Sequence, residues 1–156
     1  QETPPIPQPY WLFHITSVTV ESRTLKFYLG DYAYRSKLQA PVATWLPYLI
    51  NLTNLNLHHQ DWAQLPDALV SLRQLTRLSL HRNKLIALPD WLGDLDQLTF
   101  LDLTENCLPP LPKCLTRLRR LEVLHLSANQ LTTLPNELGQ LTALERLTLE
   151  DNRLYT

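Results

Sequence analysis

A pattern of leucines that returns at one fixed spacing constrains this chain more than any other feature of its sequence. The unit is Leu75, Leu78, Leu80, Asn83 and Leu85, and it starts again at Leu98, Leu121 and Leu144, so the period is 98 − 75 = 23 positions. A degenerate upstream copy starts at Leu52 but has Gln60 in place of the asparagine and Trp62 in place of the last leucine. A fixed period of this length indicates stacked units that each contact only their neighbours, rather than a globular core.

Each unit predicts one short strand, one turn and one short helical segment. In the LxL pattern the two leucines point inward and the residue between them points outward. The Leu-Pro pairs that follow, the first of which is Leu65-Pro66, place a proline where it suits the first position of a short 3₁₀ or α turn. The fold class is therefore an α/β solenoid with one parallel β-sheet, stabilised mainly by packing between neighbouring coils.

The asparagine of each unit stands where the chain must turn after the strand. Its side-chain amide can donate to and accept from backbone groups of that turn and of the adjacent coil. We therefore expect a structural ladder formed by Asn83, Asn106, Asn129 and Asn152.

The pattern LxxLxLxxNxLxxLPxxLxxL over residues 49–154 resembles the leucine-rich repeat family. The 23-residue, Leu-Pro form is similar to repeats of Ras-associated scaffold proteins, Roco proteins and bacterial leucine-rich proteins, including secreted effectors. The resemblance implies a curved coil with the parallel sheet on its concave face and short helical or 3₁₀ turns on its convex face. It also implies that the concave face is the binding surface, whereas the identity of the partner does not follow from the fold.

The N-terminal segment, residues 1–50, lies outside the regular repeat. Residues 1–9 contain four prolines, which favour an extended tail. Residues 10–50 are expected to cap the first coil, whose leucines and strand edge would otherwise be wet. Residues 51–156 then hold the repeats, with about five strands.

Two interpretations of residues 10–50 stay open. An alternation of apolar and polar residues on both sides of residues 21–23 predicts a β-hairpin that contains Val18, Val20, Leu25 and Phe27. The alternative is a pair of decayed repeats. The first would comprise Ile15, Val18, Val20 and Leu25, and the second Leu29, Tyr32 and Tyr34, which stand one period before Leu52, Leu55 and Leu57.

The two ends of the sequence also leave alternatives. The chain begins with Gln1 rather than methionine, which is expected if a signal peptide, a pro-region or a tag was removed, so the protein is either cytoplasmic or exported. At the other end the last coil is incomplete, and we expect one side of Leu144, Leu147 and Leu149 to be exposed to solvent. That side would be covered by more chain in a longer protein or by a second copy in a homodimer.

Parallel strands about 4.8 Å apart place equivalent residues of successive coils in columns on the outward face of the sheet. The first column holds Asn54, Arg77, Phe100, Val123 and Arg146. The second holds Asn56, Ser79, Asp102, His125 and Thr148. Two further columns hold His58, His81, Thr104, Ser127 and Glu150, and beside them His59, Arg82, Glu105, Ala128 and Asp151.

The first column has the composition of a binding hot spot. Phe100 and Val123 are apolar at outward positions and lie between Arg77 and Arg146. The alternative is an isolated surface aromatic of the kind that most proteins carry.

Charge is distributed unevenly along the columns. Basic side chains gather at the N-terminal end and acidic ones at the C-terminal end, which would orient a partner of matching polarity or would simply be a solvated surface. The predicted partner-binding residues are Arg77, Phe100, Val123, Arg146, His58, His81, Arg82, Asp102, His125 and Glu105.

Composition argues against several other functions. The net charge of −1 lacks the basic excess of nucleic-acid-binding proteins. No apolar run approaches the roughly 20 residues that cross a bilayer, so membrane insertion is not expected. With three glycines, the chain has neither a nucleophile elbow nor a phosphate-binding loop, so we expect no enzyme and no cofactor.

Metal binding and disulfide formation are not expected either. The neighbouring pairs His58 with His81 and Asp102 with His125 offer two ligands each, fewer than the three or four that zinc needs. Cys107 and Cys114 fall on opposite edges of the coil and should be unpaired.

Three functions fit the sequence. The first is a protein-binding module that holds a partner protein or peptide on its concave face. The second is the targeting segment of a larger enzyme, such as a bacterial effector ubiquitin ligase or a Roco-type GTPase. The third is an exported structural or envelope-associated repeat protein.

Overall fold

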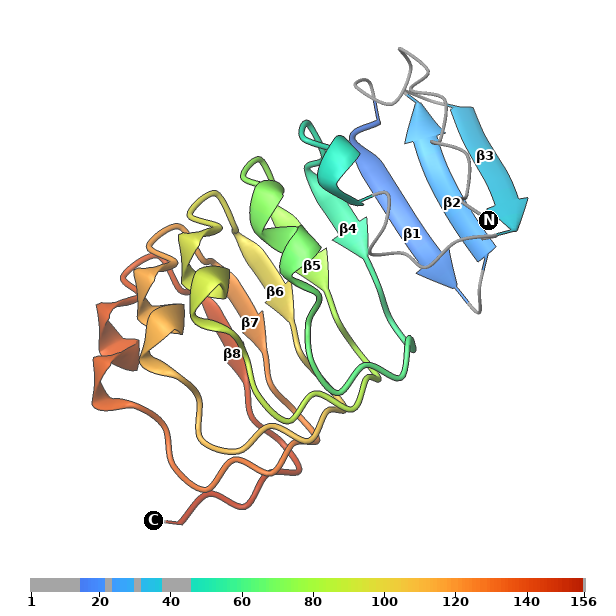
Figure 1. Cartoon of the computed structure of the whole chain (residues 1–156). Helices are drawn as coiled ribbons and strands as arrows, with labels where there is room; N and C mark the ends of the chain where they lie inside the picture. The colour runs from blue at the N-terminus through green and yellow to red at the C-terminus, as the bar shows by residue number, and fades with distance from the viewer. Residues whose placement is uncertain (1–14, 22–23, 30–31, 38–45, 156) are drawn as a thin grey trace.

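In the computed structural model, which describes residues 15–21, 24–29, 32–37 and 46–155, the chain is a curved coil (Figure 1). A single sheet has the strand order β3-β2-β1-β4-β5-β6-β7-β8. Six of these strands, β1 and β4 to β8, run parallel to one another, and β1, β2 and β3 pair antiparallel. The predicted solenoid, with its parallel sheet on the concave face and short helical turns on the convex face, is confirmed.

The repeat strands have three residues each: β4 (Asn54–Asn56), β5 (Arg77–Ser79), β6 (Phe100–Asp102), β7 (Val123–His125) and β8 (Arg146–Thr148). Their register pairs residues that are one period apart, for example Arg77 with Phe100 and Phe100 with Val123. Residues paired on neighbouring repeat strands are thus one sequence period apart. The two columns that run along these strands lie as predicted.

Short 3₁₀ helices form the opposite side of each coil: η3 (Leu46–Tyr48), η4 (Asp67–Ser71), η5 (Asp90–Asp94), η6 (Lys113–Arg117) and η7 (Asn136–Gln140). The prediction that proline takes the first helical position is wrong by one residue. Pro66, for example, has φ −69° and ψ 135°, and its carbonyl accepts the first helical bond from the Leu69 N–H at 3.1 Å. An extended residue with this role is the N-cap, and the fixed φ of proline is compatible with it.

Leucines from both sides of the coil meet in one continuous core. Leu78, Leu101 and Leu124, at the centres of their strands, are fully buried, and so are Leu69 and Leu92 of the 3₁₀ helices. At about 1.5–3 kcal/mol for each fully buried leucine, apolar burial is the main stabilising contribution.

The asparagines form the expected ladder between coils. The Asn106 Oδ1 accepts the Leu85 N–H at 3.0 Å, and its Nδ2 donates to the carbonyls of Leu80 and Leu103 at 3.1 and 3.0 Å. Asn129 and Asn152 repeat these contacts one and two coils further on. Each asparagine therefore connects its own coil to the one before it.

The sheet continues at its N-terminal end with β1 (Ser17–Glu21), β2 (Thr24–Leu29) and β3 (Tyr32–Lys37). β1 and β2 form the antiparallel hairpin that the alternation of residues favoured. β1 also pairs parallel with β4, with Val18 opposite Leu55, so it occupies the place of a repeat strand as well. Ile15 and Val18 are buried against the first coil.

The second decayed repeat is wrong. Leu29 ends β2, while Tyr32 and Tyr34 lie on β3, which is separated from β4 by β2 and β1. The spacing between β1 and β4 is 55 − 18 = 37 residues rather than one period, because the chain between them contains β2 and β3. The proline-rich segment 1–9 lies outside the described residues.

The last described coil is less covered than the others. Leu144, Leu147 and Leu149 are half-buried, whereas Leu121, Leu124 and Leu126, their equivalents one coil earlier, are fully buried. Leu154 and Tyr155 are exposed. The expected solvent exposure of Leu144, Leu147 and Leu149 is therefore confirmed.

Candidate functional site

A row of stacked side chains crosses the outward face of the sheet. The Arg77 guanidinium carbon lies 4.0 Å from the centroid of the Phe100 ring, in cation–π geometry. The other side of the row continues with His125, whose ring meets Phe100 edge to face, with centroids 5.6 Å apart and an interplanar angle of 74°. The His125 Nδ1 lies 3.0 Å from the Thr148 Oγ1. Four successive strands, β5 to β8, thus contribute to one connected surface.

The structure brings together part of the predicted hot spot. Phe100 is half-buried beneath Arg77, so it is an anchored aromatic rather than an isolated one. Val123 lies beside Phe100 in the register and Arg146 lies beyond Val123, at the far end of the column. Arg77 and Arg146 are both exposed.

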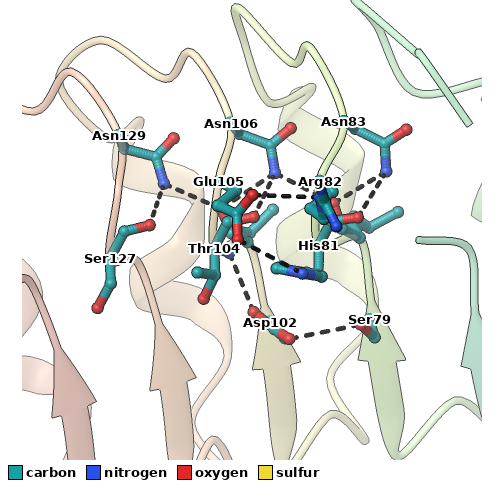
Figure 2. A network of polar contacts seen from close by, with 12 residues as sticks. Ser79, His81, Arg82, Asn83, Asp102, Thr104, Glu105, Asn106, Ser127 and Asn129 are labelled. Carbon is teal, nitrogen blue, oxygen red and sulfur yellow. Dashed lines mark hydrogen bonds and ion pairs between the residues drawn. The ribbon is translucent and has the colours of Figure 1, made fainter. Parts of the chain in front are cut away.

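A polar network borders this row (Figure 2). The Asp102 Oδ1 accepts the Thr104 N–H at 3.0 Å, and the Ser79 Oγ lies 3.5 Å from the Asp102 Oδ2. These contacts hold the Asp102 carboxylate against its own strand and the following turn. Asp102 therefore serves the local structure of the face.

The predicted separation of charge is reduced by ion pairs between neighbouring coils. The Glu105 carboxylate lies 3.2 Å from the Arg82 Nε and 3.8 Å from the His81 Nε2 (Figure 2). The acidic residue therefore lies in the coil next to the basic ones and places its negative charge against Arg82. Farther along the coil, the Ser127 hydroxyl donates a hydrogen bond to Glu150 and lowers the pKa of that carboxyl.

A hollow of about 290 Å³ opens on the N-terminal half of the same face. It is lined by Ser17, Val18, Thr19, Asn54, Leu55, Asn56, Arg77, Ser79 and Phe100. The sequence prediction missed the β1 residues of this site, since they do not follow the leucine period. In the sequence, only the repeat-like spacing of Ile15 and Val18 indicated that this segment lies beside the repeats.

Several arginines on the convex side have partners within the chain. Arg117 pairs with Asp94 at 2.9 Å, and Arg119 and Arg120 donate to the side chains of Gln140 and Gln97 at 3.0 and 2.7 Å. The basic segment at 117–120 therefore contributes contacts between coils.

Two further findings concern metals and membranes. In the described part of the chain, no three side chains of histidine, cysteine, aspartate or glutamate gather in a way that would hold a metal ion, and His58 bonds instead to Asn56, Nδ1 to Oδ1, at 2.9 Å. Within the same residues, no helix has the length and apolar character to span a membrane.

Both cysteines, Cys107 and Cys114, are free thiols.

A family model described as "Leucine rich repeat" matches residues 50–108 and 112–154. No curated protein sequence matches the chain. Among solved structures, the ectodomain of the plant membrane receptor kinase GASSHO1/SCHENGEN3 from Arabidopsis thaliana, solved in complex with CASPARIAN STRIP INTEGRITY FACTOR 2, is similar, with 35% identity over 69% of this chain and a TM-score of 0.63.

Two other similar structures come from different settings. An internalin, inlF, from Listeria monocytogenes has 25% identity over 75% of this chain and a TM-score of 0.64. A plant ice-binding protein has 28% identity over 69% and a TM-score of 0.60. The chain spans 13%, 34% and 36% of the lengths of the receptor ectodomain, the internalin and the ice-binding protein.

Proposed function

The chain belongs to the leucine-rich repeat family, and we propose that it is a protein-binding module that holds a partner protein or peptide on its concave face. Domains of this family generally mediate protein–protein interaction, and the receptor ectodomain with a similar fold was solved with a bound partner. The proposal assigns this general role to a particular surface of this chain.

The observation that carries the proposal is the stacked row of Arg77, Phe100 and His125 across the outward face of β5 to β7. Arginine and aromatic residues are enriched among the residues that dominate binding energy at protein interfaces. Stacking fixes these side chains in place before a partner arrives, which lowers the entropy that binding must overcome. An arginine–aromatic row that is already ordered is therefore well suited to be the anchor of an interface.

The surrounding polar groups fit the rim of such an interface. Asn56, Ser79 and Thr148 place amide and hydroxyl groups beside the row, and the carboxylate of Asp102 is already bonded locally. A polar rim around an aromatic centre is the usual arrangement in protein–protein contacts. Val123 extends the apolar centre by one coil.

Affinity capture tests the proposal directly. The purified chain and a variant with Phe100→Ala and Arg77→Ala are used to capture partners from an extract of the source organism, and the captured proteins are quantified by mass spectrometry. We expect at least a tenfold loss of the specific partner in the variant, because hot-spot side chains contribute that much or more.

A matched control separates this face from the rest of the surface. The control variant carries Ile86→Ala and Arg120→Ala, which likewise remove one exposed apolar side chain and one arginine, but outside the outward columns. The control should capture the partner as the unchanged chain does. Equal capture by the Phe100/Arg77 variant and by the control would contradict the proposal.

A further inference from the structure

We infer that the hollow at the junction of β1, β4, β5 and β6 receives the carboxylate of an aspartate or glutamate side chain of the bound partner. The inference rests on the proposed function and specifies which chemical group of a concave-face partner is recognised. Four observations lead to it: the size of the hollow, the chemistry of its lining, the position of Arg77 and the partners of the nearby charged groups.

The size of the hollow limits the ligand to a small part of a partner. Its volume of about 290 Å³ lies just below the range of about 300–1,000 Å³ that small-molecule pockets cover. That volume accommodates one side chain with its adjoining backbone. A segment of extended polypeptide that crosses the sheet would thus insert one residue here.

The lining favours a polar group of negative charge. Serine, threonine and asparagine side chains from β1, β4 and β5 surround the hollow. Among the lining residues, Arg77 alone carries a charge. The Asn56 Oδ1 is already engaged by the His58 N–H at 3.2 Å, so the amide NH₂ of Asn56 is the group left to donate. Hydroxyl, amide and guanidinium donors together form the kind of environment that a carboxylate accepts hydrogen bonds from.

Arg77 is oriented by its stacking. Phe100 covers one face of the guanidinium at 4.0 Å, which leaves the N–H groups in the plane of the guanidinium available to a ligand. A planar fork of N–H donors matches a carboxylate, which can accept two parallel hydrogen bonds. Stacking on Phe100 therefore positions the donors without using them.

The carboxylates nearest to this site already have partners within the chain. Among the described residues, no carboxylate oxygen lies within 4.0 Å of the Arg77 guanidinium, whereas Arg82, in the fourth column, pairs with Glu105 at 3.2 Å. Asp102 does not line the hollow: its Oδ1 accepts the Thr104 N–H, and its Oδ2 lies 3.5 Å from the hydroxyl of Ser79, which does line it. The positive charge of Arg77 is thus available to a group from outside the chain.

The charge of the site fits a carboxylate better than a phosphate. One guanidinium supplies a single positive charge, and the other lining groups are neutral. A carboxylate side chain carries one negative charge, while a phosphorylated residue carries about −1.5 to −2 at neutral pH and is usually met by a cluster of arginines. We therefore assign the hollow to aspartate or glutamate.

Peptide selection tests the inference. Short linear peptides displayed on phage are selected on the intact chain, and the peptides that bind the concave face are identified by loss of binding to Ser79→Trp or Arg146→Trp, which place bulk on its two halves. We expect these peptides to be enriched in aspartate or glutamate at one position. Arg77→Gln should weaken them about tenfold or more, while the convex control Arg120→Gln should not.

A double-mutant cycle identifies the contact. Replacing the acidic residue of the selected peptide with glutamine should cost about as much as Arg77→Gln, and the two changes together should cost little more than either one. Concave-face peptides without an acidic preference, or with unchanged affinity for Arg77→Gln, would overturn the inference and leave the proposed function standing. If a phosphoserine at the acidic position bound tenfold tighter, the assignment to a carboxylate would be overturned.

The remaining outcome concerns both proposals. If no selected peptide lost binding to either tryptophan variant, no ligand would be using the concave face, and the proposed function would fail together with this inference.

Discussion

The asparagine ladder offers the sharpest test of how the coils are held together. Asn106 is 7% exposed and makes three hydrogen bonds of 3.1 Å or less to two coils: its Oδ1 accepts from Leu85, and its Nδ2 donates to Leu80 and Leu103, with a longer contact to the Thr104 carbonyl at 3.3 Å. Asn106→Ala removes all three bonds and leaves the buried Leu85 N–H without its acceptor.

The magnitude follows from these contacts. Three hydrogen bonds at a net of about 1 kcal/mol each give about 3 kcal/mol, and the desolvation cost of the unpaired Leu85 N–H raises the loss to about 4–5 kcal/mol. Asn152 makes the same three kinds of contact, to Leu131, Leu126 and Leu149, but its side chain is half-buried. Because water can replace its bonds, Asn152→Ala should cost only about 1 kcal/mol.

Urea unfolding followed by circular dichroism measures both variants, with free energies from linear extrapolation. The two substitutions are chemically identical and remove equivalent contacts, but Asn152 is half-buried and lies in the last described coil, so each serves as the control for the other. A loss below about 1 kcal/mol for Asn106→Ala, or equal losses for the two variants, would refute the role assigned to the ladder.

Other features of the coil give further predictions. In thermal melts, Gly93→Ala should be destabilised by about 1–3 kcal/mol, because an added Cβ would lie 2.3 Å from the Cys114 carbonyl oxygen. Gly139→Ala, at the equivalent position two repeats later, meets no atom within 4 Å and should be neutral or slightly stabilised; the same loss at both positions would contradict this account. Thiol labelling of the folded chain at neutral pH should modify Cys107 before Cys114, because burial raises the pKa of the Cys114 thiol, and equal rates would be the contrary result. A hydrogen bond from Lys113 lowers the pKa of Glu137 from its ordinary value of 4.5. The stability that this pair contributes is therefore present above pH 4.5 and is lost as the pH falls through the lower folded-state pKa. Glu137→Gln should therefore lower the melting temperature slightly at neutral pH and not in strong acid, and an equal difference at both would count against the ion pair.

The repeat part of the fold could be predicted because one period encodes it. A leucine that returns once in every period must face the same core in every coil, so the buried positions, the strands and the columns all follow from spacing. The contact between Arg77 and Phe100 is a consequence of the same register, since the two residues are neighbours in one column. The pairing of Arg82 with Glu105 could have been found in the same way, because these residues are also one period apart.

The N-terminal part could not be predicted to the same extent. β1 takes the place of a repeat strand at a spacing from β4 that differs from the period, and only the pairing of Val18 with Leu55 in space reveals it. Ser17 and Thr19 therefore became part of the candidate site only once the sheet was known. A periodic pattern places residues that repeat, whereas a site at the junction with a non-repeating segment depends on tertiary packing.

The central claim is that the partner lies on the concave face, and site-specific photocrosslinking tests it most directly. Benzoylphenylalanine is placed at position 123 on the outward face of β7, or at position 113, an exposed lysine at the start of η6 on the convex side. After irradiation with the captured partner, we predict adducts from position 123 and none from position 113. Adducts from position 113 with none from position 123 would contradict the claim.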